Sequence, residues 1–342
     1  MNTPPADAHT AAPQSDTMMA IVHDGYGVPS EVLRLERIPR PSIGENEVLV
    51  RVRAASVDPG IAHMVTGLPY PVRLASKSLR APKGRVPGFG LAGQVVSVGA
   101  RVTGIVEGDN VFGIGAGSFA EYSVCRDDKI ALMPDNLDFN HAAAIPVSGL
   151  AALQGLRDHG KVQAGYKVLV VGASGGVGTF AVQIAKALGA DVTGVCSASK
   201  ADMVRSIGAD HVIDYKNENF ADGATRYDVI LDTGGNSSLG ELRRALSSHG
   251  TLVIVGGEAK GRWLGGTDRI LRALMLNPFV TQTLRAFIST EDARNLRALA
   301  KFASAGQLVP VMDQSYSLAN AVSGMRRLEE GQAKGKIVVT IP

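Results

Sequence analysis

Residues 168–200 read VLVVGASGGVGTFAVQIAKALGADVTGVCSASK, and this stretch decides the fold. Residues 168–171 have the continuous apolar character of a buried strand, and apolar side chains then recur on one face of a helix. Between them lies a turn with glycines at positions 172, 175 and 178. Glycines permit a tight turn and a close approach of the backbone, and the start of a helix offers N–H groups to an anion. The stretch therefore predicts a strand, an anion-binding turn and a helix.

The turn has the context of a dinucleotide site, because a second strand-like run follows the helix at residues 191–196. In a Rossmann fold such a turn binds the diphosphate of a dinucleotide. The alternative is a glycine turn that only packs a helix against a sheet. We assign the diphosphate to the turn and the helix start: Gly172, Ser174, Gly175, Gly176, Val177 and Gly178.

The loop after the second strand indicates which dinucleotide binds. NAD sites carry an Asp or Glu about 20 residues past the fingerprint, which accepts the ribose hydroxyls. The sequence has no acidic residue between Asp191 and Asp202, and Ser197 and Lys200 instead offer a hydroxyl and a cation suited to a 2′-phosphate. A solvated loop that happens to lack acids is the alternative. We predict NADPH as the cofactor, in preference to NADH.

Periodicity along the chain predicts two domains of an α/β protein. Residues 46–57 alternate apolar and polar side chains, and short strand candidates punctuated by glycine follow them. From about Ala142, strands alternate with helices, which is typical of a parallel sheet covered on both faces. Strand character returns near the end of the chain. We expect a disordered tail at 1–17, a β-rich domain from 18–141 and 278–342, and a doubly wound Rossmann domain at 142–277.

Composition excludes several classes of protein. The chain has 342 residues, 5% aromatic residues and a formal charge of +3, which do not suit a nucleic-acid partner. Its two cysteines cannot build a disulfide framework or a four-cysteine zinc site. The start lacks the features of a signal peptide, and no run is apolar for the roughly 20 residues of a membrane helix. We expect a soluble cytoplasmic protein.

The turn and its flanks resemble the quinone oxidoreductase branch of the medium-chain dehydrogenase/reductase superfamily. IPVSGLAALQGL precedes the turn and GADHVIDY follows the second strand, while EVLVRVRAASVDP, GSFAEY, VGG and LEEGQAKGKIVV occur in the order typical of that branch. The resemblance runs from Met18 nearly to the end of the chain. It implies a GroES-like catalytic domain built from both ends of the chain, a Rossmann domain between them, the coenzyme in the cleft and a homodimer.

The resemblance also implies further cofactor residues. Tyr215 would join Ser197 and Lys200 around the adenosine phosphate, although it suits equally a strand-end aromatic packed against the sheet. Val255, Gly256 and Gly257 would supply backbone groups to the nicotinamide amide. The apolar segment at 261–288 would be a lid or a wall of the substrate site, or else a dimer or domain contact.

Metal ligands are missing at the expected positions. The alcohol dehydrogenases of the superfamily hold a catalytic zinc with Cys and His side chains. Here residues 54–64 contain no cysteine, and Gly88, Phe89 and Gly90 stand where the zinc enzymes carry a GHE motif. His63 and Asp58 on one loop make a poor zinc site. We predict no metal.

A site without a Lewis acid suits an activated alkene or a quinone better than a simple ketone. The predicted reaction is hydride transfer to a quinone or to the C=C of an α,β-unsaturated carbonyl compound, with Asp58, His63 and Tyr70 as hydrogen-bonding candidates. Each has a structural alternative: a turn before Pro59 for Asp58, a cleft wall for His63 and simple packing for Tyr70. A zinc-free carbonyl reductase and a weakly active NADPH-binding protein remain the alternative functions. Small residues at Ala62, Gly90 and Ala151 suggest a roomy cleft.

Overall fold

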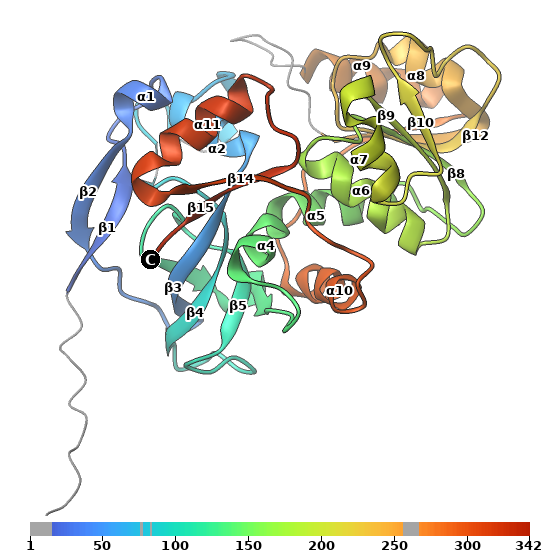
Figure 1. Cartoon of the computed structure of the whole chain (residues 1–342). Coiled ribbons are helices and arrows are strands. Elements are labelled where there is room, and N and C mark those ends of the chain that lie inside the picture. Colours follow the sequence, from blue (N-terminus) through green and yellow to red (C-terminus); the bar gives the residue numbers. More distant parts are fainter. Residues whose placement is uncertain (1–15, 76–77, 83, 256–266) are drawn as a thin grey trace, which may run out of the picture.

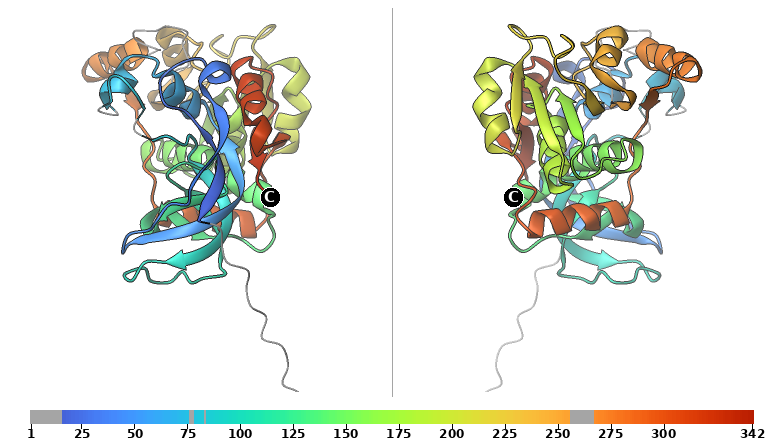
Figure 2. Two further views of the ribbon diagram at one scale, coloured as in Figure 1. Left: turned by 90° about the vertical axis from the view of Figure 1, so that its left-hand side faces the viewer. Right: turned by 90° about the vertical axis from the view of Figure 1, so that its right-hand side faces the viewer.

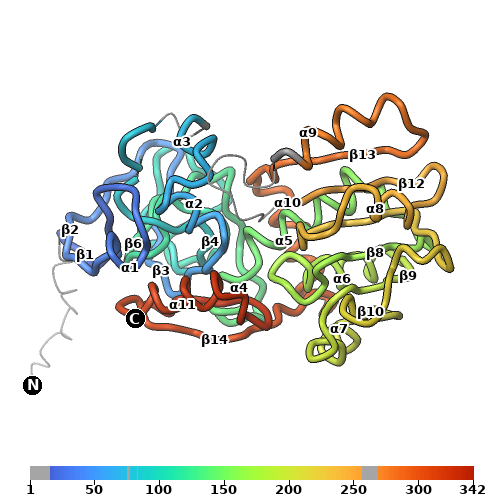
Figure 3. The backbone as a smooth tube through the Cα atoms, turned by 90° about the horizontal axis from the view of Figure 1, so that it is seen from above, coloured from blue at the N-terminus to red at the C-terminus, as the bar shows by residue number. Residues whose placement is uncertain are grey.

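Two β-sheets form the centres of two lobes, as Figure 1 and Figure 3 show. The computed structural model describes residues 16–75, 78–82, 84–255 and 267–342. The Rossmann lobe is one contiguous part of the chain, whereas the β-rich lobe takes segments from both ends. Helices at the junction of the lobes then position residues of each lobe at the cleft between them.

The Rossmann lobe holds a six-stranded parallel sheet in the order β10-β9-β8-β11-β12-β13. In sequence order this is 3-2-1-4-5-6, the doubly wound arrangement, so the order reverses between β8 and β11. Ligands bind outside the carboxyl ends of the strands at such a reversal. The strands are β8 (Lys167–Val171), β9 (Asp191–Cys196), β10 (His211–Asp214), β11 (Tyr227–Asp232), β12 (Leu246–Ile254) and β13 (Thr283–Ala286).

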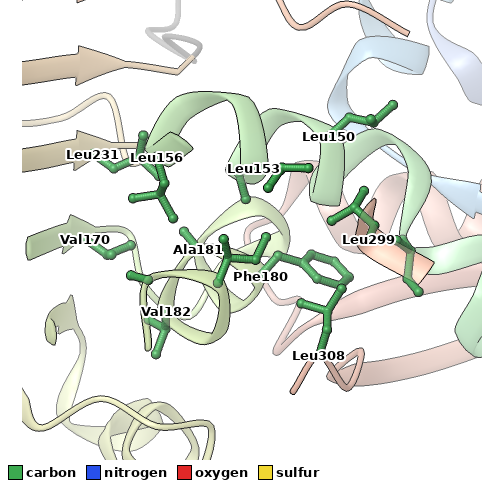
Figure 4. Packing of buried hydrophobic residues seen from close by; sticks show 14 of the residues in the cluster. Leu150, Leu153, Leu156, Val170, Phe180, Ala181, Val182, Leu231, Leu299 and Leu308 are labelled. Atoms are coloured by element: carbon green, nitrogen blue, oxygen red, sulfur yellow. The ribbon is translucent and has the colours of Figure 1, made fainter. Parts of the chain in front are cut away.

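Two helices that pack against each other join the Rossmann lobe to its neighbour. Helix α5 (Pro146–Leu153) continues as a π-helical segment, η2 (Gln154–His159), and lies against α6 (Gly176–Ala187). Figure 4 shows Phe180 of α6 between Leu153 and Leu308, with Leu299 of α10 (Ala293–Ser304) beside them. These side chains are fully buried. Because α5 is apolar on almost every face, it is held rigidly between the lobes.

The β-rich lobe is organised around β3 (Glu47–Val57), which pairs with β4 (Gly90–Val98), β6 (Tyr122–Arg126) and the last strand, β15 (Lys336–Thr340). The C-terminal strand therefore lies inside the sheet, and Figure 2 shows the C-terminal segment beside the N-terminal strands. The other strands are β5 (Asn110–Ile114), β7 (Ile130–Leu132), β14 (Met312–Ser317) and a separate pair, β1 (Thr17–Val22) and β2 (Arg34–Pro39).

The remaining helices are short. None of the helices in the described ranges is both long and apolar enough to cross a bilayer. They are α1 (Pro29–Val32), α2 (Pro59–Thr66), α3 (Pro71–Ala75), α4 (Phe139–Ala144), α7 (Ala201–Ser206), α8 (Leu239–Ala245), α9 (Thr267–Leu276) and α11 (Ala321–Glu329), with 3-10 turns η1 (Asp127–Lys129), η3 (Ala198–Lys200), η4 (Asn277–Phe279) and η5 (Leu318–Asn320).

The predicted α/β class, with a parallel Rossmann sheet and a β-rich lobe from both chain ends, is confirmed. Two boundaries differ. Strand β13 extends the Rossmann sheet to residue 286, past the expected end at 277, because a four-residue edge strand has too few residues to show alternation. Strand β1 begins at Thr17, inside the expected tail, and residues 1–15 lie outside the described ranges.

Candidate cofactor site and active-site cleft

The glycine turn joins the end of β8 to the start of α6. Gly172 has a φ of +83°, in the left-handed region that favours glycine. A Cβ built on Gly178 would lie 2.0 Å from the carbonyl oxygen of Gly172, so only glycine lets the helix start so close to the turn. Gly175 is the N-cap and makes no side-chain hydrogen bond, which leaves the first N–H groups of the helix facing outward. This cradle fits the diphosphate of a dinucleotide.

A pocket of about 480 Å³, which we call the sheet-edge pocket, lies beside the turn at the carboxyl ends of β8 and β9. Ser197, Lys200 and Tyr215, which the sequence suggested for an adenosine phosphate, all line it. Tyr215, at the end of β10, is 58% exposed, and its role at the phosphate stays a prediction. The other lining residues are Val171, Gly172, Ser174, Val195, Cys196, Glu218, Asn219, Phe220, Gly234, Asn236, Ser237 and Glu241.

The two acidic residues of the sheet-edge pocket are both engaged by their own loops. Glu218 accepts a hydrogen bond from the backbone of Asp214 at 3.0 Å. Glu241 forms a capping box with Ser238 at the start of α8, and these hydrogen bonds lower the pKa of Glu241. Lys200 donates to the carbonyl oxygen of Ala333 at 2.8 Å, across the junction of the lobes. The pocket therefore presents a cation, hydroxyls and two carboxylates that each accept hydrogen bonds from their own segment.

A second pocket of about 510 Å³, the interlobe pocket, continues from the first. It brings residues of the glycine turn opposite residues of the β-rich lobe. The residues that line both pockets are Gly172, Ser174, Lys200, Gly234 and Asn236. The others are Val57, Asp58, Pro59, Ser148, Gly175, Gly176, Val177, Thr233, Val255, Leu328, Gly331, Ala333, Gly335 and Lys336. The two pockets share five lining residues and so form one continuous track over the glycine turn.

A buried polar network forms the floor of the interlobe pocket. Asp58, at the end of β3, accepts a hydrogen bond from Ser56 Oγ at 2.5 Å and forms an ion pair with Lys336. Lys336 also donates to Ser148 Oγ of α5 at 2.9 Å, and Ser148 Oγ lies 3.4 Å from the Asp58 carboxylate. The network thus joins strand β3, helix α5 and the first residue of β15.

The other two substrate candidates lie on the segment after Asp58. His63 of α2 places Nδ1 2.8 Å from the carbonyl oxygen of Leu68. A carbonyl oxygen only accepts, so Nδ1 is the donor, and in the neutral ring Nε2 is then an acceptor. Tyr70 is partly exposed and lies under the guanidinium of Arg73. Neither His63 nor Tyr70 is among the residues that line the two pockets. Their roles, and that of Asp58, remain predictions.

Val255 follows β12 and lines the interlobe pocket, and its N–H donates to the carbonyl oxygen of Asp232. Gly256 and Gly257 lie outside the described residues, as do the first residues of the apolar segment at 261–288. Within the described ranges, no group of three or more His, Cys, Asp or Glu side chains is placed to bind a metal.

Gly90 does not enlarge the cleft, contrary to the suggestion from its small size. A Cβ on Gly90 would lie 2.3 Å from Ser56 Oγ, the hydroxyl that donates to Asp58. The space that a side chain at position 90 would take is thus filled by the buried network. Ala151 is buried, Ala62 is partly buried against the core of the β-rich lobe, and neither lines the two pockets.

Sequence reasoning missed Ser56, Ser148 and Lys336. Lys336 starts an apolar strand, KIVVT, and a lysine there normally points to solvent. The sequence held one signal. Lys336 begins an apolar strand, and so apolar a strand has to be buried, here beside β3.

Comparison with known proteins identifies two matching domains. Residues 44–135 match the alcohol dehydrogenase GroES-like domain, and residues 207–339 match the zinc-binding dehydrogenase domain. The chain is 31% identical to the 2-methylene-furan-3-one reductase of Solanum lycopersicum, over 98% of this chain and 82% of that protein. It is 32% identical to the chloroplastic NADPH-dependent alkenal/one oxidoreductase of Arabidopsis thaliana, over 94% and 79%. The quinone oxidoreductase structure from Coxiella burnetii superposes with a TM-score of 0.80 at 27% identity, covering 95% and 100%.

Proposed function

The chain belongs to the medium-chain dehydrogenase/reductase superfamily, in its quinone oxidoreductase branch, and from this premise we propose that it reduces quinones or α,β-unsaturated carbonyl compounds with NADPH and without zinc. Several relatives are named NADPH-dependent or NAD(P)H oxidoreductases. The observation that carries the proposal is the continuous track over the glycine turn, which ends at the interlobe pocket.

The residues of the track fit a dinucleotide in order. The sheet-edge pocket takes the adenosine, the turn takes the diphosphate, and the interlobe pocket takes the nicotinamide beside Val255. When bound, the reduced nicotinamide supplies the hydride for the reaction. The protein's own part is to hold the reacting atoms in a cleft walled by both lobes, where water is restricted.

NADPH is preferred over NADH because of the loop after β9. Ser197 and Lys200 line the pocket where the adenosine ribose would lie, and the loop between them carries no carboxylate. The carboxylates of Glu218 and Glu241 are bound to their own backbone and cap. A 2′-phosphate meets a cation there, whereas an NAD-type ribose finds no carboxylate partner on the loop.

Zinc independence is supported by the side chains available at the cleft. Asp58 is engaged by a serine and a lysine, and the described residues contain no cluster of three metal-ligating side chains. Without a Lewis acid, an enone or quinone is the substrate whose developing negative charge a few hydrogen bonds can stabilise.

The test follows NADPH absorbance with purified protein and a chelator, against ortho- and para-quinones, linear and cyclic enones, and simple ketones. The same panel is repeated with NADH. Chelator-insensitive oxidation by enones or quinones, with NADPH well ahead of NADH, is the expected result. Turnover of simple ketones alone would identify a carbonyl reductase, and tight NADPH binding without turnover would identify a binding protein; either outcome overturns the proposal.

We also propose a homodimer. The edge of the Rossmann lobe at α9 and η4 exposes Leu271, Met275 and Phe279, the last two at 74% and 83%, beside the edge strand β13. Large exposed apolar side chains next to an unpaired strand edge favour association. Sedimentation equilibrium should give twice the 35.7 kDa chain mass for the wild type and one chain mass for Phe279→Lys. A wild-type monomer would refute the dimer.

A further inference from the structure

A buried ion pair joins the end of β11 to the first turn of α9. Asp232, the last residue of β11, has a fully buried side chain, and its carboxylate lies 2.6 Å from the guanidinium of Arg269. Arg269 is almost as deeply buried and belongs to α9, at the edge of the Rossmann lobe in Figure 3. Burying two opposite charges is costly, and apolar residues of similar volume commonly stabilise a fold equally well. The pair therefore calls for a role beyond packing.

Both side chains also hold the loop at 233–237 that follows β11, which we call the β11 loop. Asp232 Oδ1 accepts hydrogen bonds from the N–H groups of Gly234 and of the residue after it, at 3.1 and 3.2 Å. Arg269 Nη1 donates to the carbonyl oxygen of Ser237 at 3.0 Å. The carboxylate thus fixes the start of the loop, the guanidinium fixes its end, and the ion pair joins these two supports.

The β11 loop is a wall of the track formed by the two pockets. Four of its five residues line them: Thr233, Gly234, Asn236 and Ser237. The loop also lies against the glycine turn, because Thr233 donates from its N–H and its hydroxyl to the carbonyl oxygen of Val171, at 3.0 and 2.9 Å. A Cβ built on Gly172 would lie 2.7 Å from Thr233 Oγ1. The position of the loop therefore sets the width of the track beside the turn.

The composition of the β11 loop makes it dependent on outside support. Two of its five residues are glycines, which lose more conformational freedom on folding than any other residue, and Gly235 adopts a φ of +71°. Without Arg269, Ser237 would lose its hydrogen bond and Asp232 would lose this guanidinium. The dinucleotide would then have to order a loosened loop on binding, at a cost in affinity.

We propose that Arg269 is a positioning residue for the cofactor: through Asp232 and Ser237 it holds the β11 loop against the glycine turn, and it thereby sets the affinity for the dinucleotide. Arg269 lines neither pocket, so it acts through the loop and not by touching the cofactor. The inference rests on the proposed function, since the affinity that it concerns is that for a dinucleotide. It gives α9 a task in the cofactor site in addition to its exposed apolar face.

The first arm of the test measures the loop without any cofactor. Hydrogen–deuterium exchange of the amides at 233–238 is compared between the wild type and Arg269→Met. Exchange at the loop is expected to be about tenfold faster in the variant, the effect of losing one hydrogen bond to a charged group, while the amides of β8 stay as in the wild type. Unchanged exchange at the loop overturns the proposal.

The second arm measures NADPH binding by calorimetric titration and turnover by steady-state kinetics. Arg269→Met is expected to bind NADPH about tenfold more weakly and to raise its KM equally, with kcat at saturating NADPH within about twofold of the wild type. Arg269→Lys keeps a charge opposite Asp232 and should recover part of the affinity. Arg272→Met is the matched control, because Arg272 is exposed on the same helix, and it should bind NADPH normally.

A bare carboxylate in the interior is strongly destabilising, so both arms are repeated with Arg269→Met/Asp232→Asn, which removes both charges and keeps an oxygen to accept from Gly234. The double variant should show the same faster exchange and weaker NADPH binding. Weaker binding without faster loop exchange overturns the proposal, and so does a fall in kcat with KM unchanged, which is the result of a merely structural role. If the wild type itself does not bind NADPH, the proposed cofactor is refuted, and the exchange arm still reports separately on the loop.

Discussion

Alanine at position 178 should destabilise the Rossmann lobe. Its Cβ would lie 2.0 Å from the carbonyl oxygen of Gly172 and 2.8 Å from Ala173 Cα, so the helix start must move away from the turn. Overpacking of this kind costs about 3 kcal/mol, and alanine regains at most about 1 kcal/mol of helix propensity. The net loss of about 2 kcal/mol corresponds to a melting temperature roughly 4–8 °C lower.

Gly175→Ala is the matched control for that change. Its Cβ would meet only the Gly172 carbonyl, at 3.3 Å, and its φ of −84° suits alanine. We expect a stability change below about 1 kcal/mol, with NADPH affinity about tenfold lower because the methyl group obstructs the approach of the diphosphate. Thermal unfolding by circular dichroism and NADPH titration measure both effects. If Gly178→Ala melted with the wild type, or Gly175→Ala melted far below it, the account of the turn would be refuted.

Three further predictions concern the loop after β9, a buried histidine and the cysteines. Ser197→Asp should raise the KM for NADPH at least about tenfold by repelling the 2′-phosphate while NADH is affected little; equal effects on both cofactors in steady-state assays would contradict the assignment. Burial lowers the pKa of His23 below its usual 6.5, so the unfolded chain takes up the proton more readily and stability should fall as pH drops below about 6.5. His23→Leu should flatten that slope in melting curves taken from pH 7.5 to 5, and an unchanged slope would exclude His23 as its source. Burial raises the pKa of the Cys125 thiol to about 12, so alkylation at pH 8 should leave Cys125 unmodified in folded protein. Cys196, in the sheet-edge pocket, should react slowly and be protected by NADPH. Mass spectrometry of the peptides shows which thiol reacts.

Local sequence patterns were sufficient to predict the glycine turn of the Rossmann lobe and the elements on either side of it. The strand at 168–171, the three glycines and the helix that ends at Ala187 follow one another directly in the sequence, and each element has its own periodicity or turn chemistry. The residues suggested for the adenosine phosphate follow at strand ends, and strand ends of a parallel sheet meet at one edge. Ser197, Lys200 and Tyr215 are accordingly found around one pocket.

The cleft between the lobes was much harder to predict, because its contacts join residues far apart in the sequence. Lys336 and Asp58 are 278 positions apart, and nothing local distinguishes a buried lysine from a solvated one. The prediction of extra space at Gly90 failed for the same reason. The missing side chain suggests room for substrate, but the hydroxyl of Ser56, 34 positions earlier, occupies that space. Short edge strands such as β13 escape detection for a third reason, since four residues carry no period.

The place of β15 has a consequence for how the molecule is made. The Rossmann sheet is encoded by one unbroken stretch and can assemble while the chain is still emerging from the ribosome. The β-rich lobe waits for residues 336–340, which are synthesised after the Rossmann stretch and bring Lys336 to a carboxylate that was synthesised long before. Until those residues have emerged Asp58 lacks its cation, so the cleft is completed only after the whole Rossmann stretch has been made.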